Sequence, residues 1–249
     1  MKHINILIIL MLQLLNIHCL AQNIIHATGT KTIVGNGNIQ SKEIALSSFN
    51  TIDAMSLFNI YLTQADNEKV VIEADENIIE LIELVVSNRV LMIRFNSDVK
   101  QLNSYKKLNI HVYFKDLSEI KLMGECKLFS TEESLSLKDL TLNFSGSSSG
   151  ELNLNCDKMT LHIIGSSNVK LFGKSQNVYM NCAGGSVVSA KDFIIENCKA
   201  VVSAASQTTL HVTNNLEIET RYDATVNYYG NPKHTDFSAT KGAKINKMD

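Results

Sequence analysis

Apolar and polar residues alternate over short stretches in the second half of the chain, and clusters of glycine and serine separate these stretches. Leu140, Leu142 and Phe144 precede the segment SGSSSG, and Leu152 and Leu154 follow it. A period of two is typical of a β-strand with one buried face. The pattern therefore predicts a strand on each side of SGSSSG, which is either a linker or a tight turn.

The same pattern recurs at a nearly constant step along the chain. The stretch LTLNFSGSSSGELNL begins at Leu140, similar stretches begin at Met159 and Val178, and weaker copies begin at Cys198 and Leu216. A repeat this short holds two or three strands and no helix. The small-residue corner that follows the first strand of each copy falls at Gly124, Gly146, Gly165, Gly184, Ala204 and Tyr222, with a last weak copy near Thr240, and the steps from Gly146 to Tyr222 are 19, 19, 20 and 18 residues.

A unit of about 19 residues cannot bury its own apolar face, so successive copies must stack. Stacked strands then pair in parallel about 4.8 Å apart. Glycine permits a positive φ at the corners, and serine bonds to the local backbone. The chain is therefore predicted to be all-β, a parallel β-helix of about 19-residue coils in which SGSSSG is a turn. The competing fold, an antiparallel β-sandwich, has no reason to keep a constant step.

The first part of the mature chain, residues 44–122, is less regular. It contains strand-like stretches such as FNIYLTQ, KVVIEA, VLMIRF and LNIHVYF, and the stretch from Ile78 to Val86 is compatible with a short helix. We interpret this part as irregular coils that cap the same tube, because an uncapped solenoid end exposes unpaired strands. A separate N-terminal domain is the alternative.

The N-terminus has the pattern of a signal peptide. Lys2 precedes an unbroken apolar run from Ile6 to Leu12, and small residues suit cleavage after Ala21. The run is too short to span a bilayer, and no second run of spanning length follows. We therefore predict a signal peptide over residues 1–21, an N-terminal segment over 22–43, and a single β-helical domain over 44–249. The protein is then exported, to the periplasm, the cell surface or the extracellular space.

Composition and charge exclude one class of partner. The chain has 249 residues, 45% of them hydrophobic, which is enough for a sizeable core. Its formal net charge is -2 at pH 7. A nucleic-acid-binding protein would carry a basic face, so we expect no nucleic-acid partner.

Four cysteines remain once the signal peptide is removed: Cys126, Cys156, Cys182 and Cys198. In an exported protein they suggest disulfides. The alternative is that they are small buried hydrophobes, and we prefer it because Cys182 stands where the other copies of the repeat have apolar residues. The spacing C-x-x-C of zinc and redox sites does not occur.

No group of residues has the spacing of a catalytic, metal or cofactor site, and we predict none of the three. Glu217 and Glu219 point outward on one strand and come nearest to a carboxylate cluster, although such charges are ordinary on a solvated sheet. Tyr222, Tyr228 and Tyr229 could stack on sugar rings, but we favour a role in plugging the end of the tube.

Three ordered stretches resemble a known family. They are GNGNI at 35–39, the segment FNTIDAMSLFNIYLTQADNEKVVIEADENI at 49–78, and YYGNP at 228–232, with the glycine and serine corners between the last two. Together they resemble the auto-transporter adhesin head GIN domain family, which is common in secreted proteins of Bacteroidetes-type bacteria. The resemblance implies a right-handed parallel β-helix and an exported or surface location. The sequence departs from the family pattern at SLFNI, where a glycine is usual, and at the later corners.

Three functions remain open. The first is a non-catalytic, adhesin-like binding scaffold whose partners are glycans or surface or matrix proteins. The second is a structural envelope protein that assembles with itself into homo-oligomers. The third is a polysaccharide lyase or hydrolase, which rests on fold analogy alone.

Overall fold

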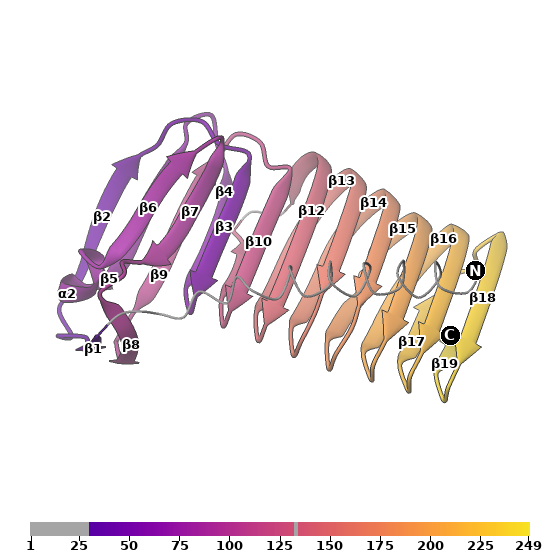
Figure 1. Ribbon diagram of the computed structural model, residues 1–249. Helices are drawn as coiled ribbons and strands as arrows, with labels where there is room; N and C mark the ends of the chain where they lie inside the picture. The colour runs from indigo at the N-terminus through magenta and orange to yellow at the C-terminus, as the bar shows by residue number, and fades with distance from the viewer. Residues whose placement is uncertain (1–29, 132–133) are drawn as a thin grey trace, which may run out of the picture.

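The computed structural model describes residues 30–131 and 134–249, and almost all of its regular structure is β-strand (Figure 1). The signal peptide predicted over residues 1–21 lies outside this part. The N-terminal elements are β1 (Lys31–Val34), β2 (Ile39–Ala45), β3 (Thr51–Ser56), β4 (Asn59–Gln64), β5 (Lys69–Asp75), the helical turn α2 (Glu76–Ile79), β6 (Ile82–Ser87), β7 (Val90–Phe95), β8 (Val99–Ser104) and β9 (Leu108–Phe114). The regular part consists of β10 (Glu119–Gly124), β11 (Lys127–Ser130), β12 (Leu135–Gly146), β13 (Ser149–Ile163), β14 (Asn168–Cys182), β15 (Val187–Ser203), β16 (Gln207–Arg221), β17 (Thr225–Tyr229), β18 (His234–Thr240) and β19 (Lys244–Lys247).

The regular part is a stack of coils joined by parallel ladders. Strands β12 to β16 each pair in parallel with the next along most of their length, so that Leu140 lies beside Met159, and Met159 beside Val178. The predicted parallel β-helix is confirmed. The right hand of the coil, which the family resemblance implies, stays a prediction.

The corners lie where the sequence places them. Positive φ angles occur at Gly124, Gly146, Gly165, Gly184, Ala204 and Tyr222. The last corner, expected near Thr240, is formed by Lys241 and Gly242. Two residues after the glycine of its corner, the buried Ser148 hydroxyl donates to the carbonyl oxygens of Ser145 at 2.9 Å and Gly124 at 3.2 Å. SGSSSG is therefore a turn of the coil, because it ties one coil to the one before it.

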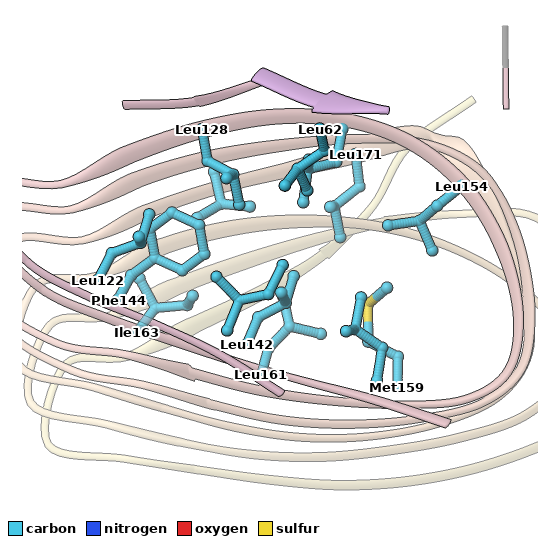
Figure 2. Packing of buried hydrophobic residues seen from close by; sticks show 14 of the residues in the cluster. Leu62, Leu122, Leu128, Leu142, Phe144, Leu154, Met159, Leu161, Ile163 and Leu171 are labelled. Atoms are coloured by element: carbon cyan, nitrogen blue, oxygen red, sulfur yellow. The ribbon is translucent and has the colours of Figure 1, made fainter. Parts of the chain in front are cut away.

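Inward-pointing apolar residues form columns inside the tube (Figure 2). Leu142 lies beside Leu161, and Phe144 beside Ile163, and all four are at most 1% exposed. Burial of one such side chain stabilises a protein by roughly 1.5–3 kcal/mol. One continuous cluster of buried residues extends from Phe49 to Tyr228, so the N-terminal part and the regular coils share a core.

The first coils of the tube are stacked out of chain order. Strand β3 pairs in parallel with β7 on one side and β10 on the other, and β4 lies in the same way between β9 and β11. The coil that comes first in the chain is therefore second in the stack. The backbone of Asn50 links it to both neighbours, since its amide donates to Arg89 O at 3.0 Å and its carbonyl accepts from Ser118 N at 2.8 Å.

Antiparallel strands cover the N-terminal end of the tube. On one wall β5 pairs antiparallel with β9, and β2 with β5; on another wall β6 pairs antiparallel with β7. The helix expected from Ile78 to Val86 is wrong beyond its first residues, because α2 ends at Ile79 and β6 begins at Ile82. Apolar Ile82, Leu84 and Val86 alternate along β6 and pack against the core, so pairing with β7 overrides the local helical pattern.

A buried carboxylate holds the cap together. Asp75 is fully buried and accepts hydrogen bonds from the backbone amides of Gly37, Lys106 at 2.8 Å and Lys107 at 3.3 Å. Burial by itself raises the pKa of Asp75, but the backbone hydrogen bonds outweigh it and hold the pKa below its usual value. One side chain thus joins the loop before β2 to the loop before β9.

Candidate binding surfaces

A groove of about 920 Å³ lies where the cap meets the first corners of the tube. Its walls come from the ends of β3 and β7, from β8, and from the corner between β10 and β11. The lining residues are Met55, Ser56, Leu57, Glu83, Arg94, Phe95, Asn96, Ser97, Val99, Lys100, Gln101, Leu102, Tyr105, Gly124 and Glu125.

The groove exists because β8 leaves the wall of the tube. Between β7 and β9 the chain pairs with β1 in a separate two-stranded parallel sheet, so β8 does not continue the stack of corners. The floor is apolar. The ring of Phe95 packs on the buried ring of Phe58 with centroids 4.9 Å apart, and Leu57 and Leu102 pack against the core.

The rim of the groove is polar and carries charges of both signs. Arg94 Nε lies 3.3 Å from Glu83 Oε2, and Lys100 and Glu125 add one charge of each sign. Burial and the nearby Glu125 raise the pKa of Tyr105 above its usual value, so its phenol stays neutral and able to donate a hydrogen bond. An apolar floor with a few polar groups around it is the usual lining of a small-molecule site.

A second, shallower concavity of about 400 Å³ runs across the middle of strands β14, β15 and β16. An asparagine ladder runs along it, in which Asn197 Nδ2 donates to Asn177 Oδ1 at 3.2 Å and Asn215 Nδ2 donates to Asn197 Oδ1 at 2.6 Å. These amides bond to each other along the stack and not outward. The ladder therefore holds the coils together and offers few free groups to a ligand.

Glu217 and Glu219 point outward on β16, as the sequence predicts. Each carboxylate is half-exposed and lies beside a cation. Glu217 forms a hydrogen-bonded ion pair with Lys199, and Glu219 Oε2 lies 3.1 Å from Arg221 Nη2. The hydrogen bond with Glu217 raises the pKa of Lys199. The two carboxylates are paired with separate cations and do not converge on a common point.

The three tyrosines near the end of the chain, Tyr222, Tyr228 and Tyr229, lie in two different environments. Tyr228 is 9% exposed, and its ring lies 5.5 Å from that of Phe237 inside the last coils, so it fills the tube. Tyr222 and Tyr229 lie on the surface, where the ammonium groups of Lys241 and Lys191 stand over their rings. Only Tyr228 fits the predicted plug.

A row of stacked rings crosses another wall of the tube. The ring of Tyr61 stacks on His111 at 4.9 Å and on Phe129 at 5.2 Å, from β4, β9 and β11. The ring of Tyr61 is covered on both faces by the other two rings, and a sugar ring would need a free face for stacking. The row therefore stabilises the pairing of neighbouring coils.

The four cysteines are buried and form no disulfides, which agrees with the interpretation preferred from the sequence. Burial raises the pKa of all four thiols, to about 11 for Cys126 and about 12 for Cys182 and Cys198. Within residues 30–131 and 134–249, no three His, Cys, Asp or Glu side chains are placed to hold a metal ion. No helix in the same part of the chain is long and apolar enough to cross a membrane.

The sequence pattern does not predict the groove. Its residues come from β8 and the neighbouring loops, where VKQLNS shows no strict alternation and no motif. The one signal is the departure at SLFNI, since Ser56 stands at a corner where a glycine is usual and also lines the groove.

Comparison with known proteins bears on both the family and the fold. The family model described as "Putative auto-transporter adhesin, head GIN domain" matches residues 48–232. No curated protein sequence matches the chain.

Several solved structures share the fold. A putative adhesin from Bacteroides fragilis NCTC 9343 has 22% sequence identity and a TM-score of 0.79, with 87% of this chain and 100% of that chain covered. A putative lipid binding protein from Parabacteroides distasonis ATCC 8503 has 18% identity and a TM-score of 0.72, over 88% and 100%. A putative adhesin from the same strain has 19% identity and a TM-score of 0.66, over 88% and 100%. At these identities the likeness shows the fold alone.

Proposed function

We propose that this chain, which belongs to the auto-transporter adhesin head GIN domain family, is an exported, non-catalytic binding protein of the cell envelope that holds its ligand in the groove beneath the cap. The observation that carries the proposal is the groove itself. Its volume of about 920 Å³ lies within the usual range for ligand sites, and its apolar floor and mixed polar rim suit an amphipathic ligand.

The alternatives have less support. A polysaccharide hydrolase needs two carboxylates that act on one bond, and Glu217 and Glu219 are each paired with a separate cation. Of the three structural neighbours described above, one is named as lipid-binding and two as adhesins. These names support binding in place of catalysis, and they make lipids a class to test beside glycans and proteins.

A binding screen of the mature chain, residues 22–249, tests the proposal. The probes are bacterial and host glycan arrays, a panel of matrix proteins, and vesicles of bacterial phospholipids. We expect saturable binding to one class, with the ligand released uncut. Absence of binding to all three classes would contradict the proposal.

Matched variants then locate the site. Tyr105→Ala removes an exposed tyrosine from the rim of the groove, and Tyr222→Ala removes an exposed tyrosine from a distant corner. We expect Tyr105→Ala to weaken binding about tenfold, the order of one lost hydrogen bond and aromatic contact, and Tyr222→Ala to leave it unchanged. Equal effects of the two variants would place the site elsewhere.

A further inference from the structure

The two ends of the tube are built differently. At the N-terminal end one wall extends beyond the parallel coils by β5 and β2, while the other extends by β6 alone. At the C-terminal end both walls stop with the same coil, because β18 pairs with β16, and β19 with β17 (Figure 1). Within the described residues, the outer edges of β18 and β19 have no partner strand.

All seven residues of β18 are exposed. Phe237 points into the tube in the same column as Ile218 and Ala200, which are completely buried, yet it is 39% exposed. No further coil covers Phe237, which is the last residue of this column in the described part of the chain. An exposed edge strand with an apolar side chain is a template for another strand.

The charges on the two edges differ. Strand β19 carries Lys244 and Lys247, and Lys247 stands at an inward position beside Tyr228, where its ammonium donates to Asn231 Oδ1 at 2.9 Å. Lysines and inward charges are the usual protection of an edge strand against pairing. Strand β18, with the sequence HTDFSAT, has no lysine and no inward charge, because Asp236 lies beside the outward-pointing Glu217. Strand β18 is thus the unprotected edge.

We propose that the edge of β18 pairs with β18 of a second copy of this chain, antiparallel, around a two-fold axis beside Phe237. Such a contact is isologous and closes a dimer. It extends one wall of each tube into the other and covers both Phe237 side chains.

The sequence of β18 suits this self-pairing. With Phe237 opposite its own copy, Asp236 faces Ser238 and His234 faces Thr240, so no like charges oppose each other. Centring the pair on Asp236 would place two carboxylates opposite each other. Centring it on Ser238 would remove the cross-strand aromatic pair, which favours strand association.

The test is the oligomeric state of the mature chain, residues 22–249, measured by light scattering and sedimentation over a range of concentrations. We expect a monomer–dimer equilibrium that Phe237→Lys abolishes. A chain that stays monomeric at millimolar concentration overturns the proposal. So does a monomer in which the amides of β18 are protected from hydrogen exchange, because another segment of the chain then covers the edge.

Two substitutions at exposed, outward positions test the register without touching the core. Ser238→Asp places like charges opposite each other twice per dimer, and we expect the dissociation constant to rise about 2- to 30-fold. The double variant Asp236→Ser, Ser238→Asp exchanges the two residues, so each aspartate again faces a serine, and the dissociation constant returns near that of the wild type. A dimer that responds to neither change does not pair through β18.

A third variant removes the protecting charge of Lys247 and should shift the monomer–dimer equilibrium in the opposite direction. Lys247→Ser removes the inward charge from β19, the other edge strand at the C-terminal end of the tube. We expect this variant to lower the dissociation constant of the dimer. A weaker dimer in this variant would mean that Lys247 contributes to the contact, which contradicts the role assigned to it. Ligand binding in the groove is independent of all these results, since the groove lies at the other end of the tube.

Discussion

The regular coils and the cap reach stability in different ways. In the coils most buried side chains lie beside an equivalent side chain of the next coil, and the glycine corners repeat one geometry. In the cap, strands change direction, and single groups such as Asp75 make contacts that nothing else repeats. Stability in the coils is therefore a sum of similar interfaces, while in the cap it depends on a few individual residues.

The corners show the same difference. Gly124, Gly146, Gly165 and Gly184 hold positive φ angles of 77–92° at successive levels. At the equivalent place beside the cap, Ser56 has a φ of 126°, where a side chain is strained. Ser56 thus holds a backbone conformation that strains its side chain, whereas these four corners are occupied by glycine.

The largest expected effect comes from a corner of the regular coils. A Cβ atom on Gly184 would lie 2.7 Å from the carbonyl oxygen of Gly165, at a φ of +84°. We expect Gly184→Ala to lower the free energy of unfolding by roughly 2–4 kcal/mol, from backbone strain and displacement of the neighbouring coil.

The adjacent glycine is the matched control. A Cβ on Gly185 would meet nothing within 4 Å, so Gly185→Ala should change stability by less than about 1 kcal/mol. Urea denaturation followed by circular dichroism measures both variants. Equal losses would show that the corner geometry is not what limits substitution.

The next effect tests the cap. Asp75→Asn replaces one of the two carboxylate oxygens with an NH2 group that cannot accept a hydrogen bond, so at least one of the backbone amides of Gly37, Lys106 and Lys107 loses its acceptor. Leaving a buried donor unpaired costs about 1–3 kcal/mol. We expect loss of hydrogen-exchange protection in the loops before β2 and β9, with the protection of β13 to β15 unchanged. Uniform loss along the chain would mean that cap and coils unfold as one unit.

The same variant has a pH signature. The pKa of Asp75 is lower in the folded protein than in the unfolded chain, so the ionised carboxylate stabilises the fold above the unfolded pKa of about 3.9. That contribution is lost as the pH falls through the lower folded value. The stability difference between wild type and Asp75→Asn should therefore shrink below about pH 4. A difference independent of pH would assign the effect to packing.

The sequence predicts the coils well because the pattern there is local. The alternation of Leu140, Leu142 and Phe144 and the glycine after it recur in the next copies, so one copy can be recognised from another. Even Ala204 and Tyr222, which have lost the glycine, keep the corner by adopting left-handed φ angles of 58° and 59°.

The order of the first coils and the groove are not local properties. The placement of β3 between β7 and β10 depends on pairing between strands that lie far apart in the chain. The groove arises because β8 pairs with β1 and not with the wall. Neither pairing leaves a periodic trace, so residues such as Leu102 and Tyr105 could be found only from the structure.

A smaller, stabilising effect is expected at Ser56. Ser56→Gly relieves the strain of a φ of 126°, and strain of this kind costs about 1–3 kcal/mol. The unfolded chain becomes more flexible, which offsets up to about 1 kcal/mol. We expect a net gain of about 1 kcal/mol in the free energy of unfolding. A loss of stability would mean that the serine side chain makes a contact that outweighs the strain.

The last prediction is that the four buried cysteine thiols do not react with a thiol reagent in the folded protein. The buried thiols of Cys126, Cys182 and Cys198 have pKa values of about 11 to 12, so almost no reactive thiolate forms at pH 8. Cys156, 7% exposed, also has a raised pKa. We expect Ellman's reagent to label none of the four in the folded mature chain and all of them in urea. Fast labelling of one thiol in native conditions would locate a coil that opens, and labelling of Cys126 first would identify it as the one beside the cap.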